Sequence, residues 1–149
     1  MSVKFKNYNR FMGDLEKRLV DGPELNIRRA MTKSAMLVDT TAKMSILRGS
    51  KSGSVVTKYN PNRTHQQSEA GEAPASDTGY LANSISYEVI KEVSGKSVEF
   101  VGVVSAGAEY AIHLEFGTTN MASRPFLRPA LISNKQKIKA IFVTQGIIK

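Results

Sequence analysis

The fold is decided by residues 85–106, which read ISYEVIKEVSGKSVEFVGVVSA. Because successive residues of a strand point to opposite faces, the alternation in the first half predicts a half-buried strand with one face made of Ile85, Tyr87, Val89, Lys91 and Val93. Ser94-Gly95-Lys96 has the composition of a hairpin turn, and the alternation resumes behind it at Val98, Phe100, Gly102 and Val104. The stretch therefore predicts two antiparallel strands joined by a tight turn.

Upstream of this hairpin the sequence predicts a long helix. Asp21 and Glu24 have the spacing of a capping box, and Pro23 is tolerated in a first helical turn. Small and apolar residues then recur every three or four positions, which predicts an amphipathic helix over 24–48: Ile27, Met31, Ser34 or Ala35, Val38, Ala42 and Ile46. A shorter, separate helix is expected before it, around Phe11, Leu15 and Leu19.

Short helices are expected on both sides of the strands. One or two turns follow Asp77-Thr78-Gly79, with Asp77 or Thr78 as the cap, and another short helix covers residues 110–116 and stops at Gly117. Pro125 or Pro129 begins the last helix, whose apolar positions are Leu127, Leu131, Ile138 and Phe142. The fold class is α+β: a small antiparallel sheet packed against a long helix in the N-terminal half and a C-terminal helix, all in one domain, 1–149.

Residues 49–79, which we call the arm, interrupt these patterns. Only Ser54–Tyr59 resembles a strand, and the sizeable apolar side chains are Val55, Val56 and Tyr59. A structureless segment of this length inside a compact domain is uncommon and is usually functional or disordered. We therefore expect a flexible arm that becomes ordered on a partner.

Composition excludes several classes of protein. The chain has 149 residues and no cysteine, so disulfide and thiolate chemistry are excluded. We expect no signal peptide at the polar, basic N-terminus and no membrane span, because no apolar run reaches about 18–20 residues. The net charge is +8, of which residues 1–60 carry +7 and residues 61–149 carry +1. A basic half attracts nucleic acid, acidic proteins or anionic membranes.

The sequence predicts no enzyme, no cofactor and no metal site. Asp77-Thr78-Gly79 is the tripeptide of aspartic proteases, and a dimer in which Asp77 of two copies shares a proton is an alternative, but the flanking residues favour a helix cap. His113 and Glu115 diverge on a helix and lack a third metal ligand, and the other histidine, His65, lies in the arm. A nucleic-acid-binding protein remains an alternative, although the sequence has no known nucleic-acid module. It would bind through the basic residues of the long helix, which are Arg28, Arg29, Lys33 and Lys43.

Four blocks in order resemble one family. They are SGSVVTKY…HQQSEAGEAPAS in the arm, DTGYLANSI at residues 77–85, YAIHLEFGTT at 110–119 and RPFLRPAL at 124–131. Together, over roughly residues 50–132, they are similar to the head–tail joining or tail-completion proteins of long-tailed bacteriophages and prophages. At residues 68–71, SEAG, the chain lacks the proline that the family often has before the glycine.

The resemblance implies a non-enzymatic protein of the virion neck or tail top, made in the host bacterial cytoplasm. Such proteins form rings, expected to be six-fold, between head-side connector proteins and tail terminator or tube proteins, with only passing contact to genomic DNA and none to membranes. The arm would order against a neighbouring subunit. Its candidate contact residues are Val55, Val56, Tyr59, Arg63 and His65.

The remaining blocks are then expected to be architectural. Phe116, Phe126 and Leu127 would fill the core, and Glu115 would pair with Arg124, with Arg128 or with the free N–H groups of the last helix. The structural residues predicted in this way are Asp77, Thr78, Gly79, Leu81, Glu115, Phe116, Gly117, Pro125, Phe126, Arg128 and Pro129.

Overall fold

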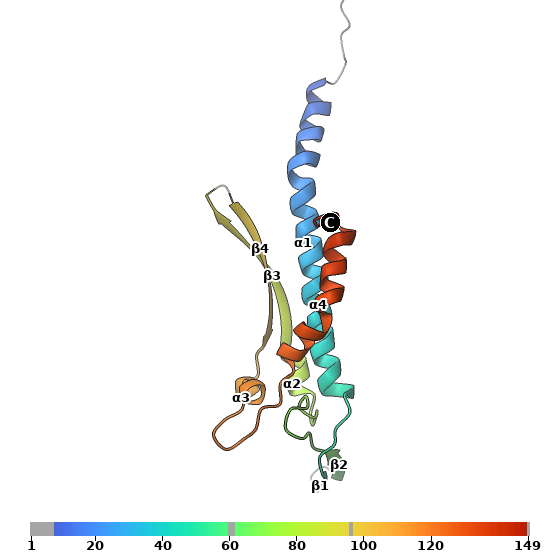
Figure 1. Cartoon of the computed structure of the whole chain (residues 1–149), viewed down its shortest axis with the longest axis vertical. Coiled ribbons are helices and arrows are strands. Elements are labelled where there is room, and N and C mark those ends of the chain that lie inside the picture. Colours follow the sequence, from blue (N-terminus) through green and yellow to red (C-terminus); the bar gives the residue numbers. More distant parts are fainter. Residues whose placement is uncertain (1–7, 60–61, 96, 149) are drawn as a thin grey trace, which may run out of the picture.

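The predicted hairpin organises the molecule. In the computed structural model, which describes residues 8–59, 62–95 and 97–148, strand β3 (Ile85–Ser94) pairs with β4 (Ser97–Ala106) in antiparallel register. Ile85 lies opposite Ala106 and Ser94 opposite Ser97, so the turn falls at the predicted position, although Lys96 lies outside the described residues. Within the described residues neither outer edge of this sheet has a partner strand. The fold is α+β, with helices on one face of the hairpin (Figure 1).

Helix α1 (Tyr8–Arg48) is a single helix, and the prediction of two helices separated near residue 21 is wrong. Pro23 lies inside it and not in a first turn. Proline removes one main-chain hydrogen bond, but the backbone on both sides keeps helical geometry, so the capping-box residues do not mark a boundary. The predicted stripe is buried from Ser34 and Ala35 onward, through Val38, Ala42 and Ile46, whereas Ile27 and Met31 are half-buried; Ala30, which was not predicted, is buried as well.

The hairpin lies directly on α1 because one strand position has no side chain. A Cβ at Gly102 would lie 3.1 Å from Met31 Sδ and 3.6 Å from Ala35 Cβ, so glycine allows β4 to approach the helix. Further along the hairpin Lys91 Nζ makes a 2.9 Å ion pair with Glu24. The face that carries Lys91 and Gly102 is therefore the inner face of the sheet.

Helix α4 (Leu127–Thr144) packs along another side of α1 (Figure 1). Asn134 joins the two helices, since its amide nitrogen donates to Thr41 Oγ1 and to the Ala130 carbonyl, both at 2.8 Å. Phe126, just before the helix, is only 1% exposed and sits in the core as expected. Leu131 was predicted to be buried, which is wrong: it is 54% exposed, because Ala130 and Asn134 make the buried side of the helix.

The arm contains a second, smaller hairpin. Strand β1 (Val55–Tyr59) pairs with β2 (Asn62–Gln66), so the one strand predicted in the arm pairs with its own chain. The base of the arm is closed by hydrogen bonds from Gly53 N to Gln67 O and from Gln67 N to Ser54 O, at 3.1 and 3.0 Å. The sequence pattern does not predict β2, which has no apolar residue.

Candidate functional site

Two candidate sites emerge from the predicted residues: the junction of helix α3 (Ala111–Phe116) with α4, and the contact of the β1–β2 hairpin with the end of the arm just before helix α2 (Tyr80–Asn83). Both combine residues far apart in sequence. The junction is built around Glu115, and the arm contact around Asp77.

Glu115 lies near the end of α3 (Ala111–Phe116) and caps the start of α4. Its Oε2 accepts hydrogen bonds from the N–H groups of Phe126 and Leu127 at 2.8 and 3.0 Å, and its Oε1 accepts one from Arg128 N–H at 2.8 Å. Of the partners left open by the sequence, the structure shows the helix start. A carboxylate there also interacts favourably with the helix dipole.

The prolines complete this cap. Helix α4 begins at Leu127, between Pro125 and Pro129, so neither proline is its first residue. The N–H groups at a helix start have no partner in the helix itself. Glu115 binds those of residues 126–128, and Pro129, the next residue, has none to satisfy. The side chain of Arg124 does not contact Glu115; its Nε donates to the Ser68 carbonyl at 3.1 Å and ties the junction to the arm.

Phe116 does not fill the core, and this prediction is wrong: its side chain is 75% exposed. With Ile112 and Leu131, also exposed, it borders an open apolar hollow of about 400 Å³ between α3 and the first turns of α4, which we call the α3 hollow. Phe126 and Leu127 also line it. The core at this point is already filled by Phe126, so Phe116 faces outward.

The β1–β2 hairpin contacts the end of the arm, just before α2 (Tyr80–Asn83), at Asp77. Lys58 of β1 donates a hydrogen bond to Asp77 Oδ2, and Arg63 of β2 lies 2.7 Å from Asp77 Oδ1. The hydrogen bond from Lys58 is the main cause that holds the pKa of Asp77 below its ordinary value of 3.8, and the charge of Arg63 adds to it. Asp77 is therefore a charged carboxylate shared by two cations.

Asp77 does not cap α2, so that prediction is wrong. The residue at the N-cap position is Gly79, which has no side chain to accept a bond. Thr78 contributes more weakly, because its Oγ1 accepts from Tyr80 N–H at 3.3 Å. Leu81, in contrast, is buried in the core as a structural residue.

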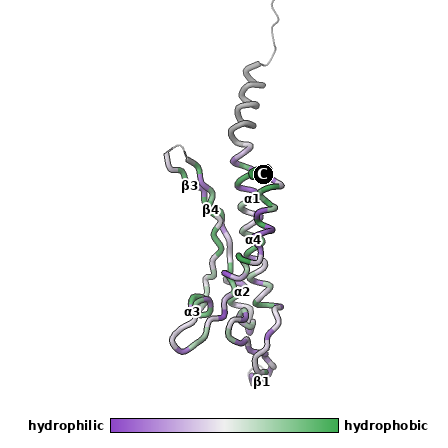
Figure 2. The backbone as a smooth tube through the Cα atoms, in the orientation of Figure 1, coloured by the Kyte–Doolittle hydropathy of each residue, from purple (hydrophilic) through white to green (hydrophobic). Residues whose placement is uncertain are grey.

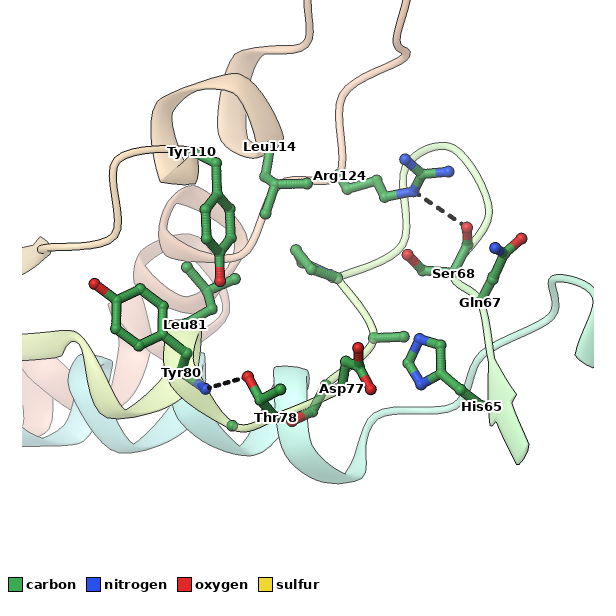
Figure 3. Close-up of a pocket in the computed structure, with 14 residues that line it drawn as sticks. His65, Gln67, Ser68, Asp77, Thr78, Tyr80, Leu81, Tyr110, Leu114 and Arg124 are labelled. Carbon is green, nitrogen blue, oxygen red and sulfur yellow. Dashed lines mark hydrogen bonds between the residues drawn. The ribbon is translucent and has the colours of Figure 1, made fainter. Parts of the chain in front are cut away.

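A pocket of about 360 Å³ opens between the arm, α2 and α3 (Figure 3). Its walls include His65 and Asp77 on one side and the rings of Tyr80 and Tyr110, whose centroids are 6.3 Å apart, on the other. Asp77 is the one carboxylate among the described residues of the lining. In a dimeric aspartic protease the second carboxylate would come from another copy, whereas here the contacts of Asp77 with Lys58 and Arg63 favour its charged form.

The predicted contact residues of the arm divide between its two faces. Val56, Arg63 and His65 are half-buried on the face toward Asp77, where Arg63 pairs with Asp77 and His65 lines the pocket. Val55 and Tyr59 project from the opposite face, with Tyr59 85% exposed. The two exposed residues are the ones that remain available to a partner.

A network of hydrogen bonds that the sequence did not predict holds the base of the arm. Lys51 Nζ donates to the carbonyls of Ser45, in the last turn of α1, and Ala73, at 2.9 and 2.7 Å. Ser52 donates twice to Glu72, and its hydroxyl bond is the main cause of the lowered pKa of Glu72. Burial lowers the pKa of Lys51. Polar residues 20 or more positions apart leave no periodic signal in sequence.

Metal ligands, membrane spans and known relatives also bear on function. No group of three or more His, Cys, Asp or Glu among the described residues could hold a metal ion. None of the helices, over the part of the chain that the structure describes, has the length and apolar character needed to cross a membrane. Comparisons of the chain with protein-family models, with curated proteins and with solved structures give no match.

Proposed function

We propose that this chain is a structural protein of the neck or tail top of a long-tailed bacteriophage or prophage, where copies of it form a ring that completes the tail and joins it to the head-side connector. Its partners are other copies of itself, connector proteins on one side and tail terminator or tube proteins on the other. The proposal starts from the four sequence blocks between residues 50 and 132.

The observation that carries the proposal is the incomplete β3–β4 sheet. Hairpins of two strands are marginally stable alone, and unpaired edges favour association with other chains. Here α1 covers one face, while the other face and both edges have no cover among the described residues. Hydrophobic stretches extend along both strands (Figure 2). A ring of copies would supply the missing contacts.

The α3 hollow and the outward face of the arm support the same reading. Large exposed apolar patches on soluble proteins are typical of interaction sites. Phe116, Ile112 and Leu131 gather on one such patch, and Val55 and Tyr59 project from the outward face of the β1–β2 hairpin. A connector that contacts proteins above and below needs several such surfaces.

Deletion of the gene from the phage or prophage that encodes the chain tests the proposal. We expect filled heads and separate tails in electron micrographs of the lysate, and joined particles after complementation in trans. The protein itself should appear in mass spectra of purified particles. Joined, infectious particles that lack the protein would contradict the proposal.

A shortened arm refines this test. Because Gly53 and Gln67 are already hydrogen-bonded, residues 55–65 can be replaced by a short Gly/Ser linker without moving the base of the arm. The shortened protein should fold, since the core lies outside the replaced segment, and should fail to join heads to tails. Tyr59→Ser with Val55→Ser is the milder variant. Normal joining by the shortened protein would show that the arm has no role in assembly.

A further inference from the structure

We propose that the outer face of the β3–β4 hairpin binds an exposed stripe of α1 on a second copy of this chain. This inference rests on the ring proposed above and names the contact that would build it. The partner is another copy because the two surfaces have opposite charge, similar apolar content and matching levels along the molecule.

The outer face is the side of the hairpin that points away from α1. Between the serines at its two ends, the register places on this face Glu88, Ile90 and Glu92 of β3, and Glu99, Val101 and Val103 of β4. Ile90 and Val101 lie opposite each other and are both exposed. The face therefore has an apolar centre with carboxylates around it.

The carboxylates of this face are in conflict with one another. Glu92 lies directly opposite Glu99 in the register, and like charges in that position destabilise a strand pair. Glu88 is on the same face of the same strand. None of the three forms an ion pair with any Lys, Arg or His whose side chain the structure describes. Cations brought by a partner would relieve this repulsion.

The stripe lies on the side of α1 that neither the hairpin nor α4 covers. Its members recur at three- or four-residue spacing and are all exposed, which defines one helix face: Arg29, Lys33, Met36, Thr40, Met44 and Leu47. Met36 is 53% exposed and Leu47 50%. Arg29 and Lys33 have no ion-pair partner among the described side chains, whereas nearby Lys43 is bonded to Asp39. The stripe is thus basic at one end and mainly apolar along the rest.

The levels of the two surfaces match. The ion pair of Lys91 with Glu24 places the charged part of the hairpin beside Glu24. Arg29 lies five residues further along α1, or about 7.5 Å at a rise of 1.5 Å per residue. A ring whose axis is nearly parallel to α1 keeps these levels from copy to copy. The long side chain of Arg29 can then reach Glu92 or Glu99 of the neighbour. Gly102 lies against Met31 and Ala35, so Lys33 and Met36 are near the level of the adjacent Val101 and of its partner Ile90.

The contact is head-to-tail because the two surfaces differ. Repetition of such a contact gives a closed ring when the rotation closes. Each hairpin would then lie between two helices, its own α1 inside and the neighbour's α1 outside. That arrangement covers the face left open in the single chain.

Charge exchange tests the contact. One variant carries Glu92→Lys with Glu99→Lys, and the other carries Arg29→Glu with Lys33→Glu. Each alone should self-associate at least about tenfold more weakly in light scattering at low salt, because it places like charges together. A mixture of the two variants, and a chain that carries all four substitutions, should regain association. Recovery in the mixture excludes misfolding as the cause of the loss.

Matched controls change the same charges elsewhere on the surface. Glu69→Lys with Glu109→Lys and Lys135→Glu with Lys137→Glu alter exposed residues away from both surfaces and should leave association unchanged. Three results would each overturn the contact. They are a wild-type chain that stays monomeric, charge-exchange variants that associate as strongly as the wild type, and variants whose weakened association is not recovered in the mixture. The contact would also be overturned if the Arg29→Glu, Lys33→Glu variant lost only nucleic-acid binding, because the stripe would then be a DNA-binding surface.

The particle experiment separates this inference from the proposed function. If the protein is present in particles and needed for joining, but charge exchange has no effect, the ring proposal stands and the contact is wrong. If charge exchange and recovery behave as expected but the particles lack the protein, the contact stands and the neck assignment is wrong.

Discussion

At the scale of single residues, Glu115 accepts three main-chain hydrogen bonds from another helix with one carboxylate. One side chain binds the N–H groups of Phe126, at the N-cap, and of Leu127 and Arg128, the first two residues of α4, so the start of α4 depends on the position of α3. This dependence extends across residues 115–128 and gives the blocks YAIHLEF and RPFLRP a shared structural purpose.

Glu115→Ala should lower the free energy of unfolding by about 2–3 kcal/mol, because it removes a charged acceptor and leaves three donors without a partner. Urea denaturation measures the difference. Glu109→Ala, an exposed glutamate just before α3, is the control and should change stability by less than about 0.5 kcal/mol. Equal effects of the two substitutions would mean that the cap contributes nothing.

Gly117 ends α3 in a conformation that favours glycine. Its φ is 80°, and a Cβ there would lie 2.9 Å from the Met121 carbonyl oxygen. Gly117→Ala should therefore destabilise the chain by about 1–3 kcal/mol. Gly22→Ala provides the contrast, because this glycine lies inside α1 and a Cβ there would have nothing within 4 Å. It should stabilise the chain by about 0.5–1 kcal/mol in the same thermal melts.

At the scale of elements, what sequence could predict depended on whether the signal was local. The β3–β4 hairpin was predicted with its turn, because two alternating strands and a turn tripeptide are all neighbours in the chain. The length of α1 was not predicted, because a proline such as Pro23 is compatible with a helix start as well as with a position inside a helix. β2 was missed because it has no apolar side chain; it is held by main-chain pairing with β1 and by the ion pair of Arg63 with Asp77.

The candidate sites followed the same division. The sequence identified Glu115 and Asp77 as notable carboxylates, but only the fold could choose among their partners. Phe116 was assigned to the core on its type alone, and its exposure depends on Phe126 having filled that space from another element. The stripe of α1 had a signal in the sequence: Met36, Met44 and Leu47 fall on the side opposite the buried residues.

The arm should loosen in acid before the core does. Glu72 and Asp77 both have lowered pKa values in the folded chain, so their stabilising contacts are present above their ordinary values of 4.5 and 3.8 and are lost as pH falls through the lower folded values. The Ser52 amide, which donates to Glu72, should report the change in an NMR titration. In Glu72→Gln with Asp77→Asn this pH dependence should disappear; its persistence would assign it to other groups.

At the scale of the whole molecule, the exposed surfaces predict that stability depends on concentration. Association that occurs only in the folded state adds to the free energy of unfolding, so the melting temperature of the wild-type chain should rise as its concentration rises. The Arg29→Glu, Lys33→Glu variant should show little of this rise. Calorimetry over a range of concentrations measures both, and a flat wild-type response would contradict the association.

The hairpin also acts as a lever. It is fixed at its root, where Ile85 is buried, and further out the ion pair of Lys91 with Glu24 ties it to α1. Ten residues of strand span about 33 Å. A rotation of about 5° at the root would therefore displace the tip by roughly 3 Å, enough to separate a hydrogen-bonded pair. The packing of side chains around Ile85 and Ala106 thus determines how precisely the tip of the hairpin is positioned against a partner protein.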